Sequence, residues 1–155
     1  MRLLPDLLAD AAADPGTTAL IEGDRAVTYA ELDDRSNRLA RALIDRGVGP
    51  ESFVALALAR SVESVSAVWA VAKTGAAFLP VDPTYPAERI AHMLTDSGVR
   101  VGITVGEHRD ALPDTVAWTV LDGDVLSGLS EHSGALITDA DRLRPLRPEH
   151  PAYMI

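Results

Sequence analysis

Between residues 53 and 105 the chain alternates apolar strand-like runs with helix-like segments, and this alternation limits the possible folds more than any other feature. The first run is continuously apolar, which is typical of a strand covered on both faces. Short links between such segments require parallel pairing through right-handed crossovers. We therefore predict an α/β fold in which helices flank a largely parallel sheet. The predicted strands are 53–58, 77–81 and 99–105, and the predicted helices are 62–73 and 86–98.

The helix between the first two of these strands has one apolar face and ends at Gly75, which permits a left-handed stop. The next helix begins at Pro86, because the first turn of a helix tolerates proline. The residues on the two apolar faces are Val65, Val68, Trp69 and Ala72 in the first helix, and Ile90, Met93, Leu94 and Ser97 in the second.

Upstream, residues 3–13 indicate a short helix. The β-prone runs 18–22 and 25–28 flank Gly23-Asp24, which is typical of a hairpin. Thr28 and Glu31 have the spacing of a capping box, so a helix should begin there and end near Gly47. Its apolar stripe consists of Leu32, Ser36, Leu39 and Leu43, and its charged residues lie mostly off that stripe: Asp33, Asp34, Arg38, Arg41 and Asp45.

The C-terminal third has weaker patterns. Residues 117–121 are compatible with an outer strand, residues 122–146 are polar and loop-rich, and residues 144–148 indicate an exposed connector. Residues 151–155 begin a strand without a following turn or cap. Domains rarely finish on a fresh apolar strand edge, because such an edge invites pairing with other chains. We therefore expect an incomplete lobe of a larger domain, prone to self-association along that edge.

Composition excludes several classes of function. The 155 residues carry a formal net charge of −9, which disfavours nucleic acid and membrane surfaces as partners. Apolar residues make up 47% and charged residues 24%, as in soluble globular proteins. The chain has no cysteine, so it has no disulfides and no thiolate metal site. No apolar run is long enough to span a bilayer and no signal peptide is evident, which indicates a cytoplasmic protein.

Three segments, in order along the chain, carry a family resemblance. Residues 27–32 (Val-Thr-Tyr-Ala-Glu-Leu) resemble the first core motif of amino-acid adenylation domains from nonribosomal peptide synthetases. Residues 73–90, with Pro-Thr-Tyr-Pro-Ala-Glu-Arg-Ile at their end, resemble the long and specific second motif, apart from Thr74 where alanine is common. Residues 151–155 (Pro-Ala-Tyr-Met-Ile) resemble the strand that precedes the third motif.

This resemblance implies an N-terminal adenylation-domain fragment, residues 1–155, cut just before the phosphate-binding loop. The complete enzyme would form aminoacyl-AMP from an amino acid and Mg-ATP, and would load the acyl group onto the phosphopantetheine thiol of a carrier protein. The implied partners are the remainder of the adenylation domain, a peptidyl carrier protein and a small accessory protein. The ribose-binding aspartate and the catalytic lysine of the family lie further downstream. We therefore assign no catalytic, cofactor-binding or metal residue here, and we expect the fragment alone to be inactive without a cofactor.

Several residues nevertheless invite a functional reading. Lys73, the only lysine, lies in the last turn of a predicted helix, where the dipole favours a cation, and the segment lacks the spacing of a phosphate-binding loop. Asp82 follows a strand, but Asp-Pro is a common turn opener, so we expect a turn or capping role. The histidines have no metal spacing and are expected at the surface: His92, His108, His132 and His150.

The remaining candidates also favour structural roles. The serines lack the Gly-x-Ser-x-Gly context of a nucleophile elbow: Ser61, Ser64 and Ser66. Asp122-Gly123-Asp124 lacks the other ligands of a calcium loop. Trp69 and Trp118 are expected in the core rather than as stacking platforms.

Two alternatives to the amino-acid ligase stay open from the sequence. One is an acyl-CoA or aryl-acid ligase of the same superfamily, which would lack a buried aspartate for a substrate ammonium group. The other is a non-catalytic interaction module, which would bind a carrier or accessory protein without any nucleotide.

Overall fold

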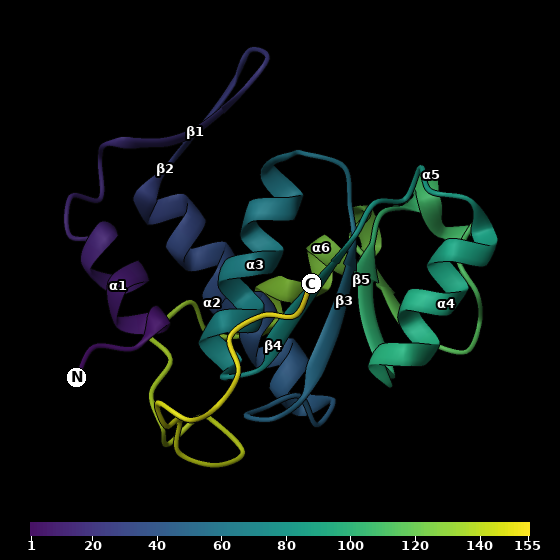
Figure 1. The fold of residues 1–155 in the computed structure, drawn as a ribbon. Coiled ribbons are helices and arrows are strands. Elements are labelled where there is room, and N and C mark those ends of the chain that lie inside the picture. Colours follow the sequence, from purple (N-terminus) through teal and green to yellow (C-terminus); the bar gives the residue numbers. More distant parts are fainter.

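The computed structural model describes the backbone of residues 1–155 and every side chain except that of Asp124. A four-stranded sheet lies at the centre, with helices on both sides (Figure 1). Its spatial order is β4-β3-β5-β6, and every neighbouring pair is parallel. The strands are β3 (Phe53–Ala57), β4 (Ala77–Val81), β5 (Val101–Thr104) and β6 (Ala117–Val120). The predicted α/β class is therefore confirmed, and β6 is the predicted outer strand.

The two faces of the sheet carry separate apolar clusters, because successive side chains of a strand point to opposite sides. On one face, Val54 and Leu56 pack with residues of α2 (Tyr29–Asp45) and α3 (Val62–Thr74). On the other face, Ala55 and Ala57 pack with Ile90 of α4 (Ala87–Ser97). The result is a three-layer arrangement.

Helix α3 is more deeply buried than its single predicted face implies. Ala67, Ala70 and Val71 are fully buried, whereas Val65 and Val68 of the predicted face are only half-buried. The cause is tertiary, because α3 is packed against the sheet on one side and against α1 (Leu4–Ala11) and α2 on the other.

The N-terminal predictions are confirmed. Strands β1 (Thr18–Glu22) and β2 (Arg25–Thr28) form an antiparallel hairpin that projects from the body of the molecule (Figure 1). The amide of Glu31 donates to Thr28 Oγ1 over 3.2 Å, and the amide of Thr28 donates to Glu31 Oε2 over 2.8 Å. This capping box begins α2 one residue after Thr28, and Gly47 follows the helix with φ +85°.

Two predictions need correction. Residues 122–146 are not uniformly loop: α6 (Gly123–Gly128) and the 3₁₀ turn η1 (Leu129–Glu131) occupy their first part. Leu129 and Ile137 enter the main core, which a largely polar sequence does not signal. Pro86 caps α4 rather than occupying its first turn. The short helix α5 (Gly106–Arg109) follows β5.

Candidate functional site

The carboxyl ends of parallel strands form the edge at which open α/β sheets bind ligands. Asp82 lies at this edge, directly after β4, and it accepts hydrogen bonds at Oδ1 from the amide and the hydroxyl of Thr84, at 2.9 and 2.7 Å. These bonds, with weaker contributions from the charges of Arg89 and His108, lower the pKa of the Asp82 carboxyl. The predicted turn role of Asp82 is thus present in the structure.

A second feature of this site is the free side of β4, where the last residues of the chain lie. Tyr153 forms a parallel bridge with Phe78, and the two rings stack with centroids 6.0 Å apart. The amide of Phe78 donates to the carbonyl of Ala152 over 3.2 Å, and the amide of Met154 donates to the carbonyl of Phe78 over 2.9 Å. The predicted start of a strand at 151–155 is therefore confirmed, and it extends the parallel sheet beyond β4.

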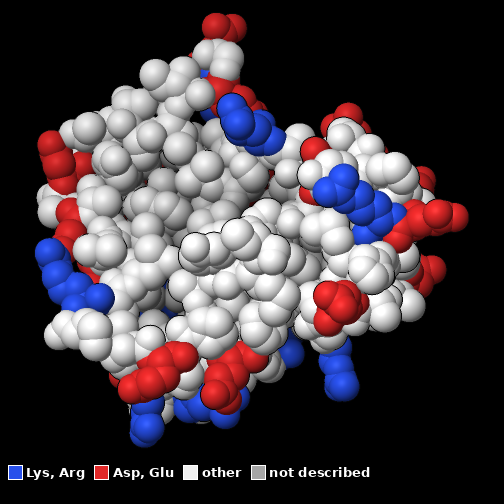
Figure 2. Space-filling view, in the orientation of Figure 1, with Lys and Arg blue, Asp and Glu red and all other residues white. Residues whose placement is uncertain are grey.

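Exposed apolar side chains mark the same place. Tyr153 is 58% exposed and Ile155 is 99% exposed. In Figure 2, charged side chains gather around the margin of the face on which the C-terminus lies, and the middle of that face is mostly uncharged. An uncharged strand edge of this kind is suited to further protein packing.

A buried polar cluster joins α2 to α3 away from this edge. Lys73 is 2% exposed, although a lysine is rarely buried without partners. Its ammonium group donates to Asp33 Oδ1 at 2.6 Å, to Ser36 Oγ at 2.8 Å and to Asn37 Oδ1 at 2.7 Å. It also lies 5.5 Å from the centroid of the Trp69 ring. Burial lowers the pKa of Lys73, and the hydrogen bond and charge of Asp33 oppose that shift.

This cluster corrects the expectation for Lys73. The residue does lie in the last turn of α3, as predicted, but the neighbouring helix supplies its partners and not the helix dipole alone. Asp33, which the pattern of α2 leaves off the apolar stripe, turns toward the ammonium group. The only sequence signal was a single lysine within an apolar segment of an otherwise arginine-rich chain.

Helix α2 also fastens the loop that follows η1. Asn37 Nδ2 donates to the carbonyl of Gly134 at 2.8 Å. Arg38 and Arg41 donate to further carbonyls of this loop, which are those of Ser130, His132, Ser133, Ala135 and Leu136. These side-chain donors replace the backbone ladder that an irregular segment lacks. The sequence analysis did not identify them.

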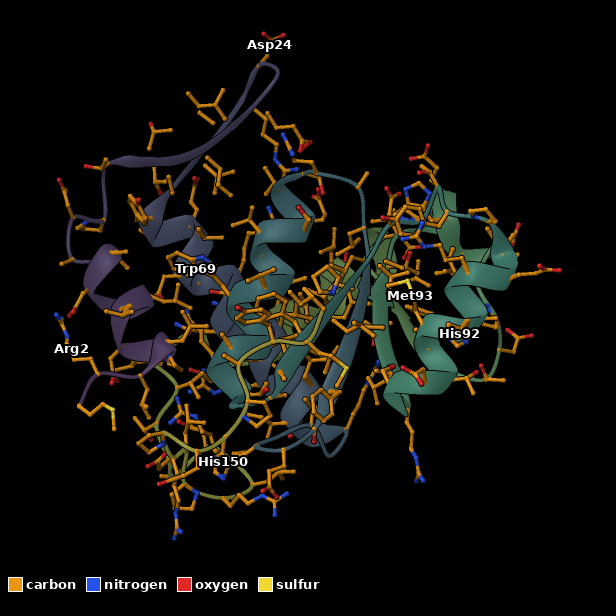
Figure 3. All side chains as sticks on the ribbon, in the orientation of Figure 1. Arg2, Asp24, Trp69, His92, Met93 and His150 are labelled. Atoms are coloured by element: carbon orange, nitrogen blue, oxygen red, sulfur yellow. The ribbon has the colours of Figure 1, made fainter. Side chains whose placement is uncertain are left out.

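The histidines are spread over the molecule. His92 on α4 and His150 near the C-terminus lie on different sides (Figure 3). His92 is exposed and the other three are half-buried rather than fully exposed. His132 Nδ1 lies 3.7 Å from Asp45 Oδ2, and His150 Nδ1 accepts the amide of Arg147 at 3.0 Å. Among the described side chains, no group of three His, Asp or Glu residues is arranged to hold a metal ion.

The serines and tryptophans take structural positions. Ser61 Oγ accepts the amide of Ser64 at 3.1 Å and caps α3. Ser66 Oγ is buried without a hydrogen-bond partner among the described residues. Trp69 is in the core, as predicted, with its ring 6.3 Å from that of Tyr29. Trp118 is half-buried, and its indole Nε1 donates to the carbonyl of Pro113 at 2.8 Å.

Asp122 precedes α6 as its N-cap residue, which places the Asp122-Gly123-Asp124 sequence at a helix start. The Asp124 side chain lies outside the described residues. No helix in the described part of the chain is both long and apolar enough to cross a membrane.

The sequence profile of the family described as AMP-binding enzyme matches residues 7–155. The phosphinothricin tripeptide synthetase PhsB of Streptomyces viridochromogenes is 44% identical over 154 residues, which are 98% of this chain and 13% of PhsB. Across three synthetases of this kind, at 43% to 44% identity, the chain covers only 2% to 13% of the relative's length.

Solved structures agree with this match. The nonribosomal peptide synthetase FmoA3, in its form bound to α-methyl-L-serine-AMP, superposes with a TM-score of 0.85 at 29% identity, over 99% of this chain and 17% of FmoA3. A further form of FmoA3 is bound to AMPPNP. NpsA of Klebsiella oxytoca, in complex with 3-hydroxyanthranilyl-AMSN, superposes with a TM-score of 0.78 at 25% identity, over 100% of this chain and 30% of NpsA.

Proposed function

The chain belongs to the AMP-binding enzyme family, as part of an adenylation domain of the nonribosomal peptide synthetase type, and we propose that the complete protein activates an amino acid. In the proposed reaction, a carboxylate oxygen of the amino acid bonds to the α-phosphorus of ATP, and pyrophosphate leaves. The phosphopantetheine thiol of a carrier protein then takes the acyl group, and AMP leaves. Carrier protein and the rest of the adenylation domain are the partners that this reaction requires.

Within that protein, residues 1–155 would be the N-terminal part of the adenylation domain and would precede its phosphate-binding loop. The observation that carries this proposal is the parallel bridge between Phe78 and Tyr153. It lies at residues whose sequence resembles the strand before the loop, and on the free side of β4. A loop that continued from this strand would start at the carboxyl edge of the sheet, where α/β enzymes bind their ligands.

The described residues supply a scaffold rather than phosphate ligands. Lys73 is the only lysine, and its ammonium group is already committed to three acceptors between α2 and α3. Asp82 accepts from its own turn. We therefore assign no residue of this chain to ATP or Mg²⁺. Backbone N–H groups and a cation for the developing phosphate charge would come from residues that follow Ile155.

Amino-acid-dependent exchange between ATP and labelled pyrophosphate tests the proposal. We expect the complete adenylation domain to catalyse exchange with one amino acid, or a small related set, when all the amino acids are offered separately. A protein of residues 1–155 is the matched control, and we expect it to catalyse no exchange. Absence of exchange from a well-folded complete domain with every amino acid, or exchange by residues 1–155 alone, would refute the proposal.

A second candidate function is aryl-acid activation, which the structural similarity to NpsA with its 3-hydroxyanthranilyl ligand favours. The same assay separates the two, with benzoic-acid derivatives offered alongside the amino acids. Exchange with an aryl acid only, and a coenzyme A or carrier thioester of that acid as product, would favour this second function. The higher identity to peptide synthetases, 44% over 98% of the chain, favours the first.

A further inference from the structure

The carboxyl end of α3 is capped by an arginine from far along the chain. The carbonyl groups in the last turn of a helix have no intrahelical donor. Arg142 Nε donates to one of them, the carbonyl of Lys73, at 2.9 Å, and Arg142 Nη1 donates to Asp139 Oδ1 at 2.6 Å. The Arg142 side chain is only 9% exposed. Its planar fork therefore holds a helix end and a carboxylate together, which a lysine ammonium would do less well.

Asp139 extends this contact to the rest of the loop. Its Oδ1 also accepts the amide of Leu146 at 3.1 Å, so one oxygen closes the segment 139–146. The hydrogen bond from Leu146, followed by that from Arg142, lowers the pKa of the Asp139 carboxyl. The loop is thus closed around a carboxylate that remains ionised at neutral pH.

The closed loop then packs on the turn between α3 and β4. Gly75 occupies this turn with φ +88°, and a Cβ at this position would lie 3.2 Å from Leu146 Cδ1 and 2.8 Å from Pro50 Cγ. Arg144 Nη2 donates to the carbonyl of Pro50 at 2.9 Å. The segment 139–146 is therefore fastened to the residues that lead directly into β4.

The same short stretch of chain receives the C-terminal strand. Phe78 lies three residues beyond Gly75 and pairs with Tyr153. Between Leu146 and Tyr153 the chain reverses in a turn, in which the amide of His150 donates to the carbonyl of Arg147 at 3.1 Å. Both ends of segment 146–153 are thus attached to residues 75–78. The position of one end limits the position of the other.

We propose that Arg142 is a positioning residue for the nucleotide site: by capping α3 and closing the loop through Asp139, it determines where the strand at Tyr153 joins β4. This inference rests on the proposed function, because the strand then sets the start of the phosphate-binding loop proposed to follow Ile155. Arg142 touches no reacting atom, and its effect on the reaction passes through the strand.

Amide hydrogen exchange tests the structural part in the complete adenylation domain. We expect Arg142→Ala to lower the protection of the Phe78 and Met154 amides by about tenfold, the effect of losing a hydrogen bond to a charged group. Arg142→Lys should restore only part of this protection, because it retains the charge but not the fork. Arg147→Ala, which removes an exposed cation from the same connector, is the control and should leave both amides unchanged.

Kinetics test the functional part in the same proteins. A displaced phosphate loop should raise the KM for ATP in pyrophosphate exchange by about tenfold and leave the KM for the acyl substrate unchanged. A variant that is merely less stable would lose active protein, which lowers the maximal rate at unchanged KM values. If Arg142→Ala does not fold, Arg142→Lys carries both measurements.

The outcomes separate this inference from the proposed function. Unchanged protection of Phe78 and Met154 in the Arg142 variants overturns the inference, whatever the kinetics show. Reduced protection with an unchanged KM for ATP also overturns it. If the unmodified domain catalyses no exchange with any acid, the proposed function fails and the assignment of Arg142 to the nucleotide site fails with it, while the exchange data still decide whether Arg142 positions the strand.

Discussion

At the scale of single residues, Lys73 is the best example of a side chain whose role depends on its neighbours. A buried charge is destabilising unless it is paired and hydrogen-bonded. The ammonium group of Lys73 meets this condition through one carboxylate, one hydroxyl and one amide oxygen, all from α2. Asn37 is fully buried in the same cluster. The cluster therefore joins two helices that the apolar core alone would leave free to shift.

Replacing this lysine should destabilise the protein strongly. We expect Lys73→Met to lower the free energy of unfolding by about 3 kcal/mol, because the acceptors Asp33 and Asn37 would lose their donor. Urea unfolding followed by circular dichroism measures the change. Arg60→Met removes an exposed cation just before the same helix and should change stability by less than about 0.5 kcal/mol. Equal effects of the two substitutions would contradict the role assigned to the cluster.

Two glycines that end helices allow a matched comparison. Gly75 after α3 and Gly98 after α4 both have positive φ, +88° and +68°. A Cβ at Gly98 would meet open space, whereas one at Gly75 would contact Pro50 and Leu146. We expect Gly98→Ala to cost about 1 kcal/mol for the left-handed backbone alone, and Gly75→Ala to cost at least about 2 kcal/mol. Thermal unfolding of both variants measures the difference, and a smaller effect at Gly75 would show that the α3–β4 turn is not tightly packed.

At the scale of elements, the loop from Ser130 to Leu146 shows how an irregular segment is held in place. Helix α2 donates to its carbonyls through Asn37, Arg38 and Arg41. Two of its own carboxylates accept backbone amides, because Asp141 Oδ2 accepts from Thr138 at 2.8 Å and Asp139 Oδ1 accepts from Leu146. The loop thus depends on ionised side chains at both ends.

Acid should release this loop before the core unfolds. The hydrogen bonds from Leu146 and Thr138 are the largest causes that lower the pKa of Asp139 and of Asp141. Because both folded values lie below the ordinary 3.8, the stabilisation is complete above pH 3.8 and is lost as the pH falls through the lowered values. We expect the protection factors of the Thr138 and Leu146 amides to fall in that range.

The control for this measurement is an amide with an acceptor that does not titrate. The amide of Ser64 donates to the hydroxyl of Ser61 at 3.1 Å. Its protection factor should stay constant over the same pH range while the core remains folded. Simultaneous loss of protection at all three amides would indicate global acid unfolding and would contradict a local release.

At the scale of the whole molecule, the sheet has an unusual side next to β4. Only the first residues of a strand lie there, and Ile155 is almost fully exposed. An unpaired strand edge with apolar side chains offers backbone donors and acceptors to any other chain that reaches it. Self-association of residues 1–155 is therefore expected from the architecture.

A protein of residues 1–155 should form dimers or larger species as its concentration rises, as measured by sedimentation velocity. Ile155→Lys should reduce this association, because an added charge on the edge strand disfavours pairing. Ile21→Lys, at the exposed hairpin, is the control and should leave association unchanged, since Ile21 is 77% exposed but lies away from the C-terminal strand. A monomer at all concentrations would exclude the sheet edge as an association surface.

How much of this was predictable depended on the range of the interactions. The hairpin at 18–28, the capping box of Thr28 and Glu31, and the order of strands and helices from Phe53 onward follow from local rules, and the structure confirms them. The short helix α6 and the burial of Ile137 were not predicted. Their residues are polar on average, and the donors that hold the loop come from α2, about a hundred residues earlier.

The sequence by itself determined the α/β class, the crossovers and the family, because apolar periodicity and contiguous motifs are properties of neighbouring residues. Only the tertiary structure decided that Lys73 is buried against Asp33 and that Arg142 caps α3. It also decided that Tyr153 joins the free side of β4. Contacts of this kind join residues far apart in the chain, and their energy depends on burial and geometry that exist only after the helices and strands have packed.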